Sequence, residues 1–280
     1  MERSLCCSHW THRIPELGCA PTTIDTEGRM KGKHVDPSTL RGQLLAQIRR
    51  NIAERGHHTY LIDEGTCPRF AYTIGLTTVL GAELVFAGGA LYDSARLGKI
   101  FDEIVYQRRA GRTLRDVIDL DELGTFTVRK ASASWTRRLL LGAHDFYGRE
   151  VAAQQIVPDE DHWTIDVPDM SVPWRPARAP VWAYLDGAWS LPVPETAIVA
   201  TDLAALRGAP VTSASRLDED YWELFAGPPA EVPNEDVRGV SLATFLGTDT
   251  SLDRIIELPV GRALWRQHRA DPWHARDATT

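Results

Sequence analysis

The stretch Phe70-Ala71-Tyr72-Thr73-Ile74-Gly75-Leu76 determines how the first half of the chain is interpreted. Aromatic, β-branched and small residues that end at a glycine are typical of a strand followed by a turn. Side chains alternate along a strand, so the hydroxyls of Tyr72 and Thr73 are expected on opposite faces. A second apolar run at 83–87 predicts a buried strand directly after it.

Hydrophobic periodicity extends outward from these two strands. Helical spacing, with start signals at Asp36-Pro37-Ser38 and at Asp93 or Ser94, predicts helices over 37–55, 94–110 and 135–147. Alternating or short apolar runs predict strands at 57–62, 126–129, 152–157, 197–200, 211–216, 221–227 and 259–266, and residues 249–256 can form a short helix. Prolines and tryptophans crowd 168–194, where Asp186-Gly187 predicts the turn of a small hairpin over 181–190.

These elements predict an α+β protein of two domains, each a largely antiparallel sheet with helices packed on it. The expected domains cover residues 39–170 and 196–270, joined by a connector with its own hairpin at 171–195. A leader at 1–38 is expected to be disordered or loosely docked, with a frayed tail at 271–280. Met30 is a second candidate for the initiator, which the intact mass of the native protein would test.

Composition excludes several classes of function. The 280 residues carry a net charge of −7, which argues against general nucleic-acid binding. No apolar run approaches the ~20 residues of a membrane span, and the N-terminus lacks an apolar signal core, so we expect a cytoplasmic protein. Cys6, Cys7 and Cys19 lie near His9 and His12, but their spacing matches no zinc module. We therefore expect reduced thiols, no metal and no cofactor.

Residues 45–170 resemble domain-of-unknown-function family 4262, a bacterial family with a P-x-F-A-Y-T-[VI]-G-L core. Pro68 and the stretch 70–76 match that core, and 82–88 corresponds to the P-E-L-[IV]-V-F-G segment with Ala82 in place of proline. Tyr147-Gly148 and 153–159 correspond to later parts of the pattern. Trp163-Thr164-Ile165 stands where the family closes with F-P-W, so that edge of any pocket differs. The resemblance implies membership rather than an activity.

Residues 196–268 resemble domain-of-unknown-function family 2185, which is similar to the immunity-protein-33 group of bacterial polymorphic-toxin systems. The match includes the opening strand 197–201, a strand ending at Arg216, the run 221–227 and the closing Pro259-Val260-Gly261-Arg262-Ala263-Leu264-Trp265-Arg266. Pro228-Pro229 replaces the family's acidic pair. This resemblance implies a small binding module, in some relatives linked to neutralising a toxin.

Two sets of residues are candidates for function. A histidine beside a carboxylate, such as His144 beside Asp145, can serve as an acid–base pair. The structural alternatives are that His144 is a favourable cation at a helix end and that the Tyr72 and Thr73 hydroxyls bond to backbone in the core. The candidate pocket near the 70–76 strand comprises His57, His58, Tyr72, Thr73, His144, Asp145 and Tyr147. Aromatic residues that could form an interaction surface, or seal two domains together, are Trp174, Trp182, Tyr184, Trp189, Trp222 and Trp265.

No sequence motif for nucleophilic, nucleotide or zinc chemistry occurs, and Cys67 has no base beside it. The sequence therefore predicts a bacterial two-domain binding or immunity-type protein that acts through contacts with a protein partner, such as a toxin-like protein. The alternative is an enzyme or small-ligand-binding protein with a pocket near the 70–76 strand.

Overall fold

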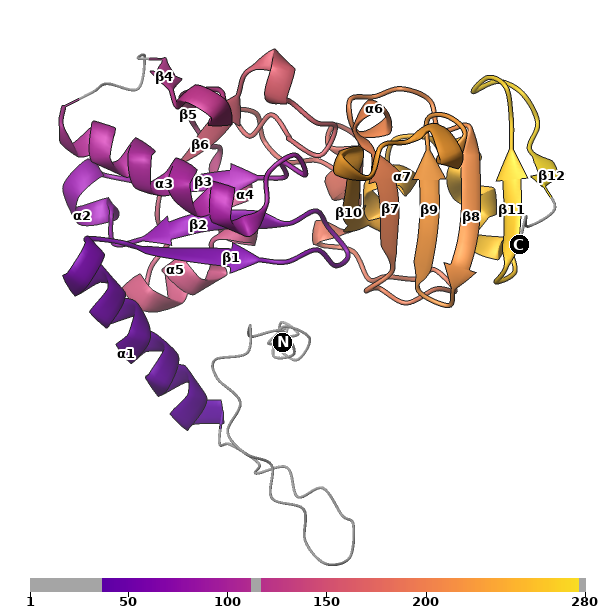
Figure 1. Cartoon of the computed structure of the whole chain (residues 1–280). Coiled ribbons are helices and arrows are strands. Elements are labelled where there is room, and N and C mark those ends of the chain that lie inside the picture. The colour runs from indigo at the N-terminus through magenta and orange to yellow at the C-terminus, as the bar shows by residue number, and fades with distance from the viewer. Residues whose placement is uncertain (1–36, 112–116, 277–280) are drawn as a thin grey trace, which may run out of the picture. The chain divides into compact units, whose positions relative to one another are not determined.

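A computed structural model describes residues 37–111 and 117–276 of the chain (Figure 1). The chain divides into two compact units, residues 1–47 and 48–280. The second unit holds every strand, and the first contributes to the description only the opening of helix α1 (Pro37–Arg55). The predicted leader at 1–38, with its cysteines, histidines and Met30, lies almost entirely outside the described residues.

The first sheet has six strands in the order β1-β2-β3-β6-β5-β4. Its neighbours pair antiparallel except β3 and β6, which run parallel. The strands are β1 (His58–Ile62), β2 (Phe70–Ile74), β3 (Glu83–Ala87), β4 (Ile118–Asp119), β5 (Thr125–Lys130) and β6 (Ala153–Pro158).

Helices cover both faces of this sheet, which explains why every residue of β2 and β3 is buried. Helix α3 (Ser94–Arg109) packs its apolar stripe on the face that carries Ala71 and Phe86. Helix α5 (Leu141–Tyr147) lies on the opposite face, where the Tyr72 hydroxyl reaches it (Figure 1). The remaining elements of this region are α2 (Thr77–Leu80), α4 (Ala133–Leu139), η1 (Asp121–Leu123) and η2 (Glu160–His162).

The second sheet also has six strands, in the order β10-β7-β9-β8-β11-β12. Only β7 and β9 pair in parallel. The strands are β7 (Ile198–Asp202), β8 (Ser213–Asp218), β9 (Tyr221–Phe225), β10 (Val237–Ser241), β11 (Arg262–Trp265) and β12 (His274–Arg276). The helical elements are α6 (Leu203–Leu206), α7 (Leu242–Leu246), η3 (Pro180–Leu185), η4 (Pro229–Glu231), η5 (Asn234–Asp236) and η6 (Thr250–Glu257).

One face of the second sheet forms its core and the other carries no helix of the described chain. Trp222 and Leu224 point into the core, where they pack with Phe245 of α7 and Ile255 of η6. Figure 1 shows α7 behind the strands and no α-helix in front of β7, β9 and β8, although Ala200, Ser215 and Phe225 on that face are buried. Because side chains alternate, Glu223 points to this uncovered face.

The α+β prediction with two sheet-based domains is confirmed. Three local predictions are wrong. Residues 180–185 form η3 instead of a hairpin strand, because burial of Trp182 overrides the Asp186-Gly187 turn signal. The predicted helix over 135–147 is two helices that meet at Leu140. Part of the tail pairs with β11 as strand β12.

Candidate functional site

The most connected polar group of the first sheet is Glu83, whose side chain is fully buried at the start of β3. No ion pair to lysine or arginine is found for it within the described residues. Its two carboxylate oxygens instead accept six hydrogen bonds of 2.7–3.2 Å, from the Thr73 and Thr77 hydroxyls, the Tyr147 hydroxyl and the amides of Gly75, Leu76 and Thr77.

These bonds fix the turn between β2 and α2 onto the first residue of β3. Gly75 has a φ of 119°, a conformation that favours glycine, and its amide also donates to the Tyr147 hydroxyl at 2.8 Å. Burial and the hydrogen bond to Glu83 raise the pKa of Tyr147 to about 12. With every acceptor direction of the carboxylate engaged by donors of the chain, Glu83 acts as an internal anchor.

Thr73 belongs to this network, whereas Tyr72 bonds to α5 on the opposite face of β2. The Thr73 hydroxyl donates to Glu83 and accepts from the amide of Leu84. The Tyr72 hydroxyl accepts from the amide of Gly142 at 3.1 Å, and a Cβ on Gly142 would lie only 2.6 Å from it. The hydroxyls of the candidate residues Tyr72, Thr73 and Tyr147 therefore all bond to partners within the protein. Neither Glu83 nor Gly142, the partner of Tyr72, was a candidate from the sequence.

The paired histidines lie at the start of β1 and use different partners. His57 is buried, with its Nε2 atom 3.3 Å from Asp102 of α3. His58 is half-buried, and its Nδ1 atom lies 2.8 Å from the side-chain amide nitrogen of Asn51. Burial is the largest cause that lowers the pKa of each, and each also has a neighbouring positive charge. The folded protein therefore favours the neutral form of both imidazoles.

The histidine pair makes stability depend on pH in a defined direction. A lowered folded-state pKa means that the stabilisation is complete above the unfolded value of about 6.5 and is lost as the pH falls. We expect the free energy of unfolding, from urea titrations between pH 5 and pH 8, to fall on the acid side of neutrality. The variant carrying H57Q and H58Q should show a flatter profile; an unchanged profile would contradict this assignment.

His144 stands apart from the other candidate residues, with both ring nitrogens engaged in its own region. Its Nδ1 atom accepts from the amide of Val151 at 3.2 Å, so Nε2–H donates to the carbonyl of Thr136 at 2.9 Å. Asp145 is exposed on the same helix. The structure thus brings Thr73 and Tyr147 together at Glu83, while Tyr72 bonds to Gly142 on the other face of β2 and the histidines bond elsewhere.

Two further candidate groups are internal. Cys67 is buried, and burial with the nearby charge of Glu64 raises the pKa of its thiol to about 12, so it is not a thiolate at neutral pH. Asp166, which the sequence analysis missed, is buried and accepts from the Thr164 hydroxyl and the amide of Ala90. Burial raises the pKa of Asp166.

The aromatic candidates separate by exposure. Trp182 and Trp222 lie in the core, where their indole N–H groups donate to the carbonyls of Asp166 and Ile255. Trp174, Tyr184 and Trp189 are half-buried in the connector. Only Trp265, at the end of β11, is strongly exposed, and its ring lies 5.3 Å from that of His274.

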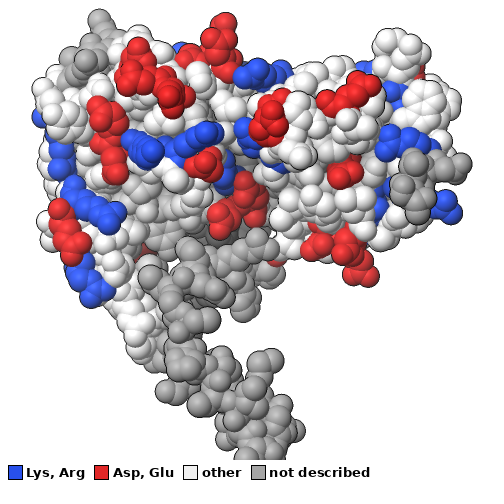
Figure 2. All heavy atoms as spheres, in the orientation of Figure 1, with Lys and Arg blue, Asp and Glu red and all other residues white. Residues whose placement is uncertain are grey.

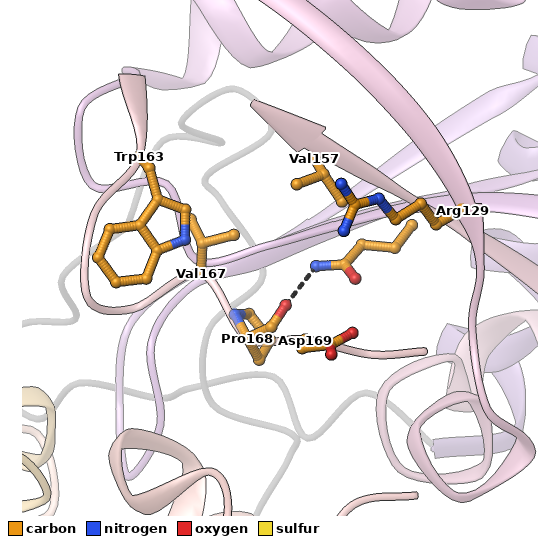
Figure 3. Close-up of a pocket in the computed structure, with 7 residues that line it drawn as sticks. Arg129, Val157, Trp163, Val167, Pro168 and Asp169 are labelled. Atoms are coloured by element: carbon orange, nitrogen blue, oxygen red, sulfur yellow. Dashed lines mark hydrogen bonds between the residues drawn. The ribbon is translucent and has the colours of Figure 1, made fainter. Parts of the chain in front are cut away.

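A hollow of about 180 Å³ opens beside β5 and β6 (Figure 3). Its floor includes the buried Gln155, whose side-chain amide donates to the carbonyl of Pro168 at 2.6 Å. Figure 3 shows Arg129 reaching in from the strands and Trp163 across from it. The lining residues are Arg129, Gln155, Val157, Trp163, Val167, Pro168 and Asp169, none of which was a candidate from sequence.

The uncovered face of the second sheet has Glu223 near its centre. Within the described chain its carboxylate has no hydrogen-bond or ion-pair partner. The register places the small residues Ala200 and Ser215 on either side of it. Figure 2 shows a mostly uncharged surface over these strands, with acidic side chains between and at the ends of them and basic ones toward β11 and β12.

In residues 37–111 and 117–276, no group of three or more metal-ligating side chains comes together. Over the same ranges, no helix combines the length and hydropathy that crossing a bilayer requires.

Comparison with known proteins supports the first resemblance. No curated protein and no solved structure matches the chain significantly. The resemblance of the second domain to an immunity-type family therefore stays a prediction. Residues 51–164 match the model of a family described as Domain of unknown function (DUF4262). This range contains the Glu83 network and no strand of the second sheet.

Proposed function

We propose that this protein is a non-catalytic binding protein that holds a protein partner on the uncovered face of its second sheet. The observation that carries the proposal is Glu223, a half-buried residue in the middle of a face without an α-helix, whose carboxylate has no partner within the described residues. Leaving such a charge partly desolvated is costly unless a partner compensates it. A face of this kind is typical of an interaction surface.

Charge identifies the chemistry of the partner. Acidic residues flank the face at the β8–β9 turn, with Asp218, Glu219 and Asp220, and beyond β9, with Glu231 and Glu235; all five are exposed. A partner that presents a lysine or arginine side chain to Glu223 would complement this arrangement. A basic toxin-like protein, which the resemblance of the second domain implies, is one member of this class.

The surroundings of Glu223 suit a flat contact with one inserted cation. Ala200 and Ser215, both small and buried, flank Glu223, while Tyr221 and Ile198, each more than a third exposed, lie together at one end of the strands. An aromatic ring and an aliphatic side chain next to a buried charge pair are typical of the centre of a protein interface. The proposed contact therefore combines one ion pair with apolar packing.

The polar candidates of the first domain support a binding rather than a catalytic role. Tyr72, Thr73, Tyr147 and His144 direct their polar atoms to partners within the chain. A general acid or base must instead reach a proton of its substrate. The proposed function thus rests on the second sheet.

Charge reversal at Glu223 tests the proposal. Purified products of the genes neighbouring this one are titrated against the wild-type protein, and a basic product is expected to bind. The E223K variant should weaken binding at least tenfold, because like charges would then face each other.

The matched control is E122K, which places the same charge change on an exposed residue of η1 in the first domain. It should bind as the wild type does. The E223Q variant, which removes the charge without reversing it, should give an intermediate loss. Equal binding by E223K and wild type, with unchanged thermal stability, would overturn the proposal, as would the absence of binding by every neighbouring product.

A further inference from the structure

We propose that the hollow beside β5 and β6 is a binding site for a small monocarboxylate with a flat apolar body. The inference does not depend on the proposed protein interface. The volume of the hollow, about 180 Å³, corresponds to about six water molecules at ~30 Å³ each. This is below the range of drug-sized ligand pockets, ~300–1,000 Å³, so the ligand is of the size of a single ring with a carboxyl group.

Arg129 supplies the charge that selects the carboxylate. The register of β5 against β6 sets Arg129 opposite Gln155, and its guanidinium has no hydrogen-bond or ion-pair partner within the described residues. The side-chain amide of Gln155 donates to the carbonyl of Pro168 and accepts from the amide of Met170. The guanidinium therefore has its planar pair of donors available for a carboxylate, the group it binds in two-point geometry.

The other walls select the body of the ligand. The indole of Trp163, 39% exposed, lies across from Arg129, with Val157 and Val167 between them (Figure 3). An exposed indole beside apolar side chains favours a flat ring. Asp169 on the rim repels an anion more strongly the more negative charge the anion carries, which favours a monocarboxylate over phosphate. Its Oδ1 atom already accepts two hydrogen bonds from Ser171.

Titration by saturation-transfer nuclear magnetic resonance with benzoate tests this site on the full chain. Benzoate is expected to saturate with a millimolar dissociation constant, while benzylamine and inorganic phosphate do not compete with it. The R129Q variant should weaken benzoate binding about tenfold, the value of one charge-assisted contact. R129K should retain part of it, because lysine keeps the charge and loses the two-point geometry.

The matched control is R178Q, an exposed arginine of the connector that does not line the hollow. It should bind benzoate as the wild type does. Equal binding by R129Q and wild type would overturn the proposal, as would equal competition by benzylamine or the absence of saturable binding. Binding of benzoate by E223K is expected to be unchanged, so failure of this site and failure of the proposed protein interface are distinguishable.

Discussion

Replacing Glu83 by alanine is expected to lower the free energy of unfolding by about 3–5 kcal/mol, the loss typical of breaking a buried charged network. The variant leaves the hydroxyls of Thr73, Thr77 and Tyr147 and the amides of Leu76 and Thr77 without their acceptor in the interior, while the Gly75 amide keeps the Tyr147 hydroxyl. Each unsatisfied buried donor costs about 1–3 kcal/mol, and only local rearrangement limits the sum. Urea denaturation followed by circular dichroism measures the loss.

Two companion variants show whether the loss comes from the hydrogen bonds. E83Q retains one carbonyl acceptor and should lose less than E83A. E122A removes an exposed carboxylate of the same domain and should change the free energy of unfolding by less than about 0.5 kcal/mol. If E83A unfolds at the same urea concentration as the wild type, Glu83 is not the anchor of the β2–α2 turn.

Arg266 is the corresponding anchor of the second domain, and R266M is expected to cost about 3–5 kcal/mol. Its side chain is almost fully buried, and its guanidinium lies 3.0 Å from Asp249 and 4.3 Å from the ring centre of Trp273. It also donates to the carbonyl of Val211 and the hydroxyl of Ser251. Methionine fills the space but removes the buried cation, so that Arg269 is the one arginine left in an ion pair with Asp249 among the described residues.

A double-mutant cycle isolates the pair. Burial raises the pKa of Asp249, but hydrogen bonds from Ser251 and Arg266 and the charge of Arg269 outweigh it, so the pKa lies below its ordinary value. That stabilisation is present above pH ~3.8 and is lost as the pH falls through the lower folded-state pKa. The losses in R266M and D249N should therefore sum to more than the loss in the double variant. Strict additivity would contradict the pairing.

Both anchors lie in the stretches that carry the family resemblances. Glu83 and its donors Thr73, Gly75 and Tyr147 lie within the stretch that matches the family model, and Arg266 ends the stretch whose resemblance to a second family stays a prediction. Buried polar groups tie these segments together because each must find its partners within the fold. In this chain Glu83 and Arg266 thus hold the fold together through partners within it.

Local signals in the sequence predicted most of the strands but not the partners of the polar side chains. The run 70–76 and the Asp93 cap predicted β2 and the start of α3, since both depend on neighbouring residues. Glu83 is bonded by Tyr147, 64 positions away, and no local pattern reports such a contact. Likewise the turn signal at 186–187 could not show that Trp182 is held in the core by Phe70 and Trp135.

The candidate sites differ in how much of each can be predicted from the sequence. His57 and His58 were visible as titratable residues, but their burial and their separate partners depend on α3 and α1. Glu223 lies in a run predicted to be a strand, yet its position on an uncovered face depends on where α7 and η6 pack. Arg129 and Trp163 come together only because the chain after β6 folds back beside β5.

The hydrogen–deuterium exchange footprint of the bound partner tests the proposed function most directly. Backbone amides are followed by mass spectrometry in the free protein and in its complex with the neighbouring product that binds. The proposed interface predicts slower exchange in β7, β8, β9 and β11 and in the β8–β9 turn, with the first sheet unchanged. Protection confined to the first sheet or to the connector, with β9 unaffected, would contradict binding at the uncovered face.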